Sequence, residues 1–187
     1  RGAMRMMYHH AVATLAMCEA YGLTESQLFR DSAQSGLDFI AEAQNPGKGW
    51  RYTPKCGDND TSVTTWCVLA LKSGDVAGLD APNRCFRGAL DWVREVTDEA
   101  YGRVGYTAKG TGKVLILGKN EDWEHHETMT AMGMLVRKFV DPAGEKAKIE
   151  SGAKLLVSDL PVNAKMKVDS YYWYYGSLAL YQFDGPD

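Results

Sequence analysis

The stretch from Gln44 to Leu71, QNPGKGWRYTPKCGDNDTSVTTWCVLAL, contains the end of one predicted helix, a glycine-rich turn with Trp50, and the start of an apolar helix. Asp60 stands directly before that second helix, where a carboxylate can cap the first free backbone amides. Other parts of the chain repeat this order of helix, turn and helix. The stretch therefore predicts a fold built from helical hairpins.

Four segments share the apolar pattern of the helix that starts at Thr61, and they align without gaps. They comprise residues 9–21, 61–73, 126–138 and 172–184. One aligned column reads Leu15, Cys67, Met132 and Leu178, and the next column holds smaller residues. The spacing between the segments suits two-helix repeats of unequal length.

Amphipathic segments lie between these apolar ones, at residues 26–44, 83–97 and 145–159. Their apolar residues recur at intervals of three and four, and their opposite faces are charged. This alternation predicts an inner layer of apolar helices covered by an outer layer, with about seven helices in all. Gly22 and Gly74 stand where inner helices are predicted to stop, and Pro82 and Pro142 are predicted to begin turns into outer helices.

Residues 101–122 are rich in glycine and form the one long irregular stretch. We interpret them as an insertion in the helical array, within which residues 114–117 form a short strand or a flap. We expect residues 1–187 to make one domain. We also expect this domain to be a fragment of a longer protein.

Composition narrows the classes of partner. The chain has 187 residues, a formal net charge of -3 and no run of Lys and Arg, which argues against nucleic acid as a partner. The longest apolar run, residues 11–17, is too short for a transmembrane segment. Cys18 and Cys67 lie inside apolar helical patterns and are predicted to be buried thiols, whereas Cys56 and Cys85 lie nearer predicted loops or helix starts.

The outer segments carry a recurring motif of a small residue, an aromatic residue, an aliphatic residue, a Gln and a Gly-Trp turn. Its first copy is Ser35-Gly36, Phe39-Ile40, Gln44 and residues 47–50. Its second copy is Arg87-Gly88, Trp92-Val93, Thr97 and Gly105-Tyr106, with Thr in place of Gln and Tyr in place of Trp. A worn third copy is Ser151-Gly152, Leu155-Leu156 and Leu160. We expect Gln44, Trp50, Trp92 and Tyr106 to be structural residues of this motif.

This order resembles the Gln-Trp repeat of squalene-hopene and oxidosqualene cyclases. The inner segments also resemble repeats in planctomycete proteins of the terpene cyclase or prenyltransferase-like type. The resemblance extends over residues 7–183 and implies an α/α-toroid-like array of helical hairpins. Because the chain holds three hairpins and one further helix, it implies an incomplete ring, left open or completed by the remaining part of the toroid or by a partner chain. It does not imply one activity, because fold does not settle function.

The cyclases of this superfamily protonate a double bond with an Asp-x-Asp-Asp-Thr motif before an inner helix. Here the same place reads Gly57-Asp58-Asn59-Asp60-Thr61, so that only Asp60 and Thr61 match. An amide at position 59 cannot donate a proton to an alkene, which argues against this chemistry. Asp60 is therefore interpreted first as a helix cap and only second as a catalytic acid.

Aromatic and histidine side chains supply the candidate ligand-binding residues. The residues chosen as ligand-lining candidates are His10, His126, Tyr172, Trp173 and Tyr175. Aromatic walls suit isoprenoid chains and other apolar ligands, although the same rings can simply fill the core. No cofactor is predicted. Zinc bound by Cys56, Asp60 and His126 is the alternative, because protein prenyltransferases hold zinc with these residue types.

These observations favour a non-catalytic binding or scaffold module whose ligand is an isoprenoid, another apolar molecule or a partner segment. The alternative is an enzyme that processes isoprenoids, either part of a cyclase or a zinc-dependent prenyltransferase-like protein. A purely structural repeat in a large surface protein is the third reading.

Overall fold

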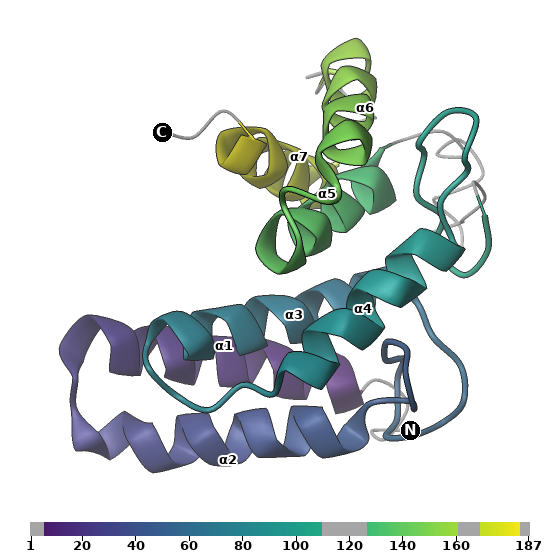
Figure 1. The fold of residues 1–187 in the computed structure, drawn as a ribbon. Coiled ribbons are helices and arrows are strands. Elements are labelled where there is room, and N and C mark those ends of the chain that lie inside the picture. The colour runs from purple at the N-terminus through teal and green to yellow at the C-terminus, as the bar shows by residue number, and fades with distance from the viewer. Residues whose placement is uncertain (1–5, 110–126, 161–168, 184–187) are drawn as a thin grey trace. The chain divides into compact units, whose positions relative to one another are not determined.

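The computed structural model describes residues 6–109, 127–160 and 169–183. These residues form seven α-helices and no strand, so the prediction of an all-α fold is confirmed. The helices are α1 (Met6–Thr24), α2 (Gln27–Ala43), α3 (Thr61–Val76), α4 (Asn83–Glu95), α5 (Thr128–Val140), α6 (Lys146–Ser158) and α7 (Ser170–Phe183) (Figure 1). The chain divides into two compact units, Arg1–Trp92 and Val93–Asp187, and the division falls within α4.

In the first unit, α1 packs against both α2 and α3, and α2 also contacts α3. The approach of α1 to α2 depends on a glycine, because a Cβ atom at Gly36 would lie 2.5 Å from Oγ1 of Thr14. Met7, Leu37 and Leu71 are fully buried and form part of the core. Burial of such apolar side chains is the main favourable term in folding.

In the second unit, α5 packs against α6 and α7, and α6 contacts α7. Met132, Leu135 and Leu156 are buried in this core. In each unit, therefore, two of the predicted inner helices lie in contact, α1 with α3 and α5 with α7. The arrangement of all hairpins in a ring stays a prediction.

Several predicted helix ends agree with the structure. Ser26 is the N-cap of α2, with its hydroxyl accepting from the amide of Leu28 at 3.4 Å, and Pro82 directly precedes α4. The second predicted turn residue, Pro142, lies between α5 and α6.

The two predicted glycine stops are wrong, because α1 continues past Gly22 to Thr24 and α3 continues past Gly74 to Val76. Both glycines serve helix packing instead. A Cβ atom at Gly74 would lie 2.4 Å from a methyl carbon of Leu37, and one at Gly22 would lie 3.2 Å from the Cβ of Ala77. The absence of a side chain lets helices approach, and the local pattern alone does not distinguish this role from a helix end.

The predicted insertion, residues 101–122, is described only as far as residue 109. Its first part forms a turn in which Gly102 has a φ of 76°, closed by an antiparallel bridge between Thr97 and Val104. The predicted strand or flap at residues 114–117 lies outside the described residues.

All four cysteines are free thiols, and Cys18 and Cys67 are buried as predicted. Burial raises the pKa of Cys18 to about 11. Among the described helices, none combines the length and the apolar character that crossing a bilayer requires.

Candidate functional site

Side-chain amides hold the turn after α2. Gln44 is the C-cap residue of α2, and its Nε2 donates to the carbonyl of Lys48 at 2.6 Å and to that of Cys85 at 3.0 Å. A single amide therefore joins the end of α2 to its own turn and to the first residues of α4. Gly88 makes room for it, because a Cβ atom there would lie 2.7 Å from Nε2 of Gln44.

Trp50 fills the same turn and is 1% exposed. Its indole Nε1 donates to the carbonyl of Ile40 at 2.8 Å, and its backbone amide donates to Oγ1 of Thr64 at 3.1 Å. The indole thus fixes the turn to α2 while the backbone fixes it to α3. We call residues 44–64 the first joint.

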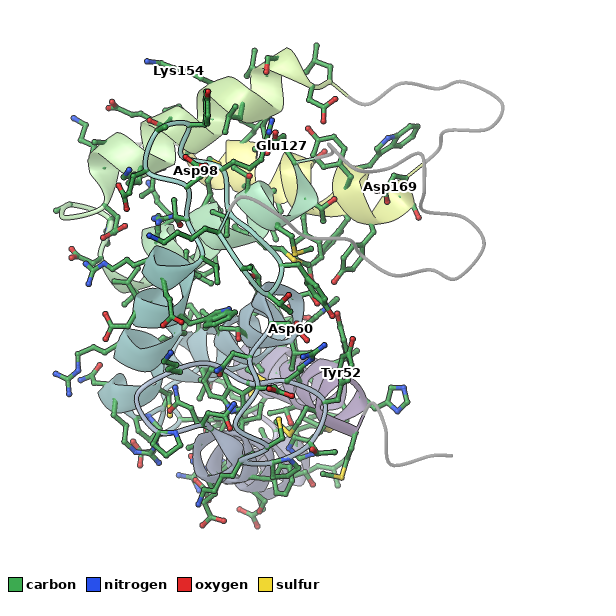
Figure 2. The ribbon with its side chains drawn as sticks, turned by 90° about the vertical axis from the view of Figure 1, so that its right-hand side faces the viewer. Tyr52, Asp60, Asp98, Glu127, Lys154 and Asp169 are labelled. Carbon is green, nitrogen blue, oxygen red and sulfur yellow. The ribbon has the colours of Figure 1, made fainter. Side chains whose placement is uncertain are left out.

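Asp60 closes the first joint as the N-cap residue of α3, which confirms its predicted capping role. Its Oδ1 accepts from the amide of Val63 at 2.7 Å and from Oγ of Ser62 at 3.0 Å. The side chain is fully buried, and Nε of Arg51 lies 3.8 Å from Oδ2. Negative charge at a helix N-terminus is favourable because the aligned peptide dipoles present positive charge there. Figure 2 labels Asp60 and Tyr52, the residue whose ring faces the Arg51 guanidinium at 5.2 Å.

Asn59 stands where the cyclase motif places its proton donor, and its side chain is engaged by Asn45. Nδ2 of Asn45 donates to Oδ1 of Asn59 at 2.9 Å and to the carbonyl of Asp58 at 2.7 Å, while its Oδ1 accepts from the amide of Gly57 at 2.9 Å. These bonds hold residues 57–59 against the end of α2. They give the segment a structural role in the first joint.

The structure describes two of the three residues of the zinc alternative, Cys56 and Asp60. Cys56 is exposed, and its sulfur lies 3.4 Å from the carbonyl of Asp58. His126, the third member of the predicted set, lies outside the described residues. Across residues 6–109, 127–160 and 169–183, no three His, Cys, Asp or Glu side chains are grouped so that they could hold a metal ion.

Glu127 occupies the corresponding position before α5, where the sequence analysis had singled out His126. Its side chain is 2% exposed and makes no cap hydrogen bond to the helix backbone. Instead, Oε1 accepts from Nε of Arg103 at 2.7 Å, and Oε2 accepts from Oγ1 of Thr130 at 2.6 Å. The guanidinium of Arg103 has a raised pKa because it donates to this carboxylate.

Val104 takes the place that Trp50 has in the first joint. Its backbone amide donates to Oγ1 of Thr130 at 3.2 Å, as that of Trp50 donates to Thr64. Tyr106, which the motif aligned with Trp50, is half-buried, and the backbone bond that Trp50 makes in the first joint is made here by Val104, two residues earlier. The segment from Thr97 to Val104 is one residue longer than that from Gln44 to Trp50.

A buried ionic network links the end of α4 to α5 and α6. Arg137, 2% exposed, donates from Nε to Oε2 of Glu145 at 2.7 Å and from Nη2 to Oγ1 of Thr97 at 2.9 Å. Arg94 donates from Nε to Oε1 of the same glutamate at 2.9 Å. Burial lowers the pKa of Arg137, while Glu145 opposes that shift. We call residues 97–104 and 127–130, together with Arg137 and Glu145, the second joint.

This network and the Arg103–Glu127 pair were not predicted from the sequence. Their partners are 24 residues apart in the case of Arg103 and Glu127, and 40 apart in the case of Thr97 and Arg137. No periodic pattern connects residues at such separations. The available signal was the pair Arg137-Lys138 at the end of the apolar segment 128–140, because a charge that is buried with such a segment needs a partner.

His10, a predicted ligand-lining residue, lies between two helices. Its Nε2 is 3.0 Å from the carbonyl of Gly36, and its ring centroid is 4.4 Å from that of Phe39. Both partners belong to α2. His10 therefore uses the side of α1 that packs against α2.

The aromatic run of α7 divides between core and surface. Tyr172 is buried, and its hydroxyl donates to the carbonyl of Asp159 at 2.6 Å, which ties α7 to the end of α6. Tyr175 is fully buried, with edge-to-face ring contacts to Tyr171 and Tyr174, both at 5.0 Å. Trp173 is half-buried. The burial of Tyr172 and its bond to Asp159 are typical of a core residue.

Trp92, the remaining predicted motif residue, is buried with 5% exposure at the end of the first unit. Comparison of the chain with protein-family models, with curated proteins and with solved structures found no match.

Proposed function

We propose that this chain is a terpene cyclase/prenyltransferase-like repeat domain that acts as a non-catalytic binding or scaffold module for an apolar ligand or a partner segment. The observation that carries the proposal is the role of Asp60. The one acid that matches the cyclase motif is fully buried and accepts hydrogen bonds from Val63 and Ser62. A carboxylate in this position stabilises the start of α3.

The neighbouring groups support the same proposal. Asn59 replaces the proton-donating acid and is bonded to Asn45. Glu127, the buried acid before α5, is paired with Arg103 and Thr130. Catalysis of alkene protonation requires an acid that carries a proton and is aimed at the substrate, whereas these side chains serve the joints between helices.

The experiment is an activity assay with a matched variant. The purified protein is incubated with squalene and, separately, with geranylgeranyl diphosphate, and the products are analysed by mass spectrometry. Asp60→Asn is the matched variant, because asparagine caps helices about as well as aspartate but cannot donate a proton in this way. We expect no product from either protein. Product from the natural chain that disappears in Asp60→Asn would overturn the proposal.

Metal and ligand content give a second readout. We expect native mass spectrometry to reveal an apolar ligand or a bound segment, and elemental analysis to find no stoichiometric zinc. Zinc that is present and lost in His126→Ala would favour the enzyme. If neither zinc nor lipid is present and Trp173→Ala only lowers the melting temperature, the role is that of a scaffold.

A further inference from the structure

The last helix, α7, has one covered side and one uncovered side. Its buried residues are Tyr172, Tyr175, Gly176 and Ala179. Tyr174 and Tyr181 lie on the opposite side of the helix and are 52% and 66% exposed. We call this side the tyrosine face. None of the 14 residues of α7 is charged, and a helix without a charged side is normally covered on all sides, so the tyrosine face indicates a contact surface.

The ring of Tyr174 is held in place although it is half exposed. It meets the ring of the buried Tyr175 edge to face, with the ring centroids 5.0 Å apart, and Tyr171 meets the same ring at 5.0 Å. A ring that is fixed before binding loses little conformational entropy on binding, and tyrosine is enriched among the residues that dominate interfaces. The tyrosine face is therefore an ordered aromatic surface suited to packing against another helix.

The first helix, α1, also has an uncovered side. Its buried residues are Met7, Ala11, Thr14 and Cys18. Val12, which is 42% exposed, and the exposed Ala13 and Ala16 lie on the other side, which we call the alanine face. The exposed ionisable residues of α1 are His9 and Glu19. The alanine face is thus nearly uncharged and carries small side chains at its centre.

Each uncovered side is turned away from the inner helix of its own unit. In the first unit, α1 packs against α3: the hydroxyls of Tyr8 and Ser62 share a hydrogen bond, and a Cβ atom at Gly74 would lie 3.4 Å from Sγ of Cys18. In the second unit, α7 packs against α5. The alanine face therefore belongs to the first inner helix of the chain and the tyrosine face to the last one.

The two faces complement each other in size and in charge. Tyr174 and Tyr181 project from α7, whereas Ala13 and Ala16 leave a shallow depression on α1, and helices pack closely when large side chains enter such depressions. Because α7 has no charged residue, no like charges meet when the faces are joined. A tyrosine hydroxyl can also hydrogen-bond to a histidine or a glutamate at the edge of the alanine face.

Another apolar surface borders α7 but selects no partner by its charge. This groove is lined by side chains that include Val157 of α6 and Leu180 of α7. Glu150 and Lys154, which have opposite charges, both line it, so that it favours neither a cation nor an anion. The tyrosine face, by contrast, favours an uncharged helix surface.

We propose that the tyrosine face of α7 binds the alanine face of α1 in a second copy of this chain. This inference rests on the proposed role as a scaffold module and names the partner segment. It extends to a second molecule the kind of contact that α1 makes with α3 and α7 with α5. Because different surfaces of the two copies meet, the contact is heterologous, and it either closes a ring of copies or continues into a row.

The test is sedimentation velocity of the full chain over a series of concentrations. We expect complexes larger than the monomer, with a mass that rises with concentration. Tyr181→Lys and Ala16→Lys each place a charge on one of the two faces, and each should weaken self-association by about tenfold or more. Lysine is a good helix former, so the circular dichroism spectra should stay unchanged. Leu28→Lys, at an exposed leucine of α2, is the control and should associate like the natural chain.

A mixture of the two variants tests whether the contact joins α7 to α1. Tyr181→Lys keeps the natural alanine face, and Ala16→Lys keeps the natural tyrosine face. One intact contact is therefore possible between the two variants. We expect the equimolar mixture to form a one-to-one complex of two copies and nothing larger, whereas each variant alone stays a monomer at the same concentration.

Three results would overturn the proposal. One is a natural chain that stays a monomer up to its limit of solubility. Another is self-association that persists in Ala16→Lys and disappears in Tyr181→Lys, because α7 would then pair with α7 of the second copy. The third is a monomeric natural chain whose co-purified apolar molecule is lost in Tyr181→Lys, which would make that molecule the occupant. None of these results depends on turnover of squalene or geranylgeranyl diphosphate, so failure of this inference is distinguishable from failure of the proposed function.

Discussion

After α2 the chain is held chiefly by side-chain amides, to which Arg84 and Arg51 add charged contacts, whereas after α4 the corresponding bonds run through a buried network of Arg and Glu. In the first joint, Gln44 donates directly to the carbonyl of Cys85 in the first turn of α4. In the second joint, Thr97 stands in the position of Gln44, and Arg137 connects it to Glu145 before α6. Each arrangement ties the end of one amphipathic helix to the start of the next.

The difference follows from the length of one side chain. The hydroxyl of Thr97 donates to the carbonyl of Val93 within its own helix, so it does not reach the next amphipathic helix. A long side chain from a third helix, that of Arg137 on α5, spans the distance instead. Where Thr97 cannot make the contact that Gln44 makes, Arg137 of a neighbouring helix makes the connection instead, and its charge is buried as a result.

The largest expected effect comes from Arg137→Met, because it removes the centre of the second joint. It leaves the buried carboxylate of Glu145 with one guanidinium fewer and Thr97 without its donor. We expect a loss of about 3 kcal/mol in the free energy of unfolding, since breaking a buried ion pair is far more costly than breaking an exposed one. Urea titration followed by circular dichroism measures it.

Lys138→Met is the matched control for this variant, because Lys138 is the next residue of α5 and is only half-buried. It should change the free energy of unfolding by less than about 0.5 kcal/mol. Equal losses in the two variants would mean that the ionic network contributes no more than the α5 surface does.

Gln44→Met tests the first joint and should cost less than Arg137→Met. The carbonyls of Lys48 and Cys85 lose a neutral donor, which predicts a loss of about 1–3 kcal/mol. Gln27→Met, at the exposed first residue of α2, is the control and should hardly change the free energy of unfolding. If Gln44→Met proved more destabilising than Arg137→Met, the first joint would contribute more to stability than the second joint.

The acids before α3 and α5 have different partners: Asp60 caps the backbone of α3, whereas Glu127 is paired with Arg103. Asp60→Asn should change stability by only a few tenths of a kcal/mol, because asparagine keeps the cap to Val63. Glu127→Gln should cost about 1–2 kcal/mol, because Arg103 loses the carboxylate to which it donates. Thermal unfolding of both variants in parallel checks the order. A larger loss in Asp60→Asn would show that the charge of Asp60, rather than its capping oxygen, is needed.

Local features could be predicted from the sequence, and distant pairs could not. The cap at Asp60 follows from short-range chemistry that the sequence displays directly. The partners Arg103 and Glu127 meet only after the chain has folded, so no spacing rule identifies them. Gly74 shows the limit between the two cases: the sequence marks a special position, but only the nearby Leu37 reveals that packing is the reason.

In the candidate site, too, some features could be predicted from the sequence and others could not. The motif predicted that Gln44 and Trp50 would be structural, and their bonds to Cys85 and Ile40 are of that kind. It could not predict that Val104 takes the place of Trp50, because one extra residue in a turn shifts the register without leaving a mark in the pattern. The apolar groove that Val157 of α6 and Leu180 of α7 help to line could not be predicted either, since exposed apolar residues form a groove only when two helices bring them together.

The smallest expected effect is electrostatic and lies at the rim of the second joint. Nζ of Lys148 on α6 lies 2.6 Å from Oε2 of Glu99, and this hydrogen bond, followed by the charge of Lys148, lowers the pKa of Glu99 below its usual value. A carboxyl with a lowered folded-state pKa adds stability that is present above its ordinary pKa and disappears as the pH falls through the lowered value. Because Glu99 is exposed, this contribution is small and screened by salt.

Lys148→Ala should therefore raise the pKa of Glu99 back toward its usual value, measured by NMR titration of the side-chain carboxyl carbon. Lys146→Ala, at an exposed lysine of the same helix, should leave it in place. The surface ion pair of the first joint is longer, because Nη1 of Arg51 lies 3.8 Å from Oδ2 of Asp58. If the pKa of Glu99 stays lowered in Lys148→Ala, the shift does not arise from this pair.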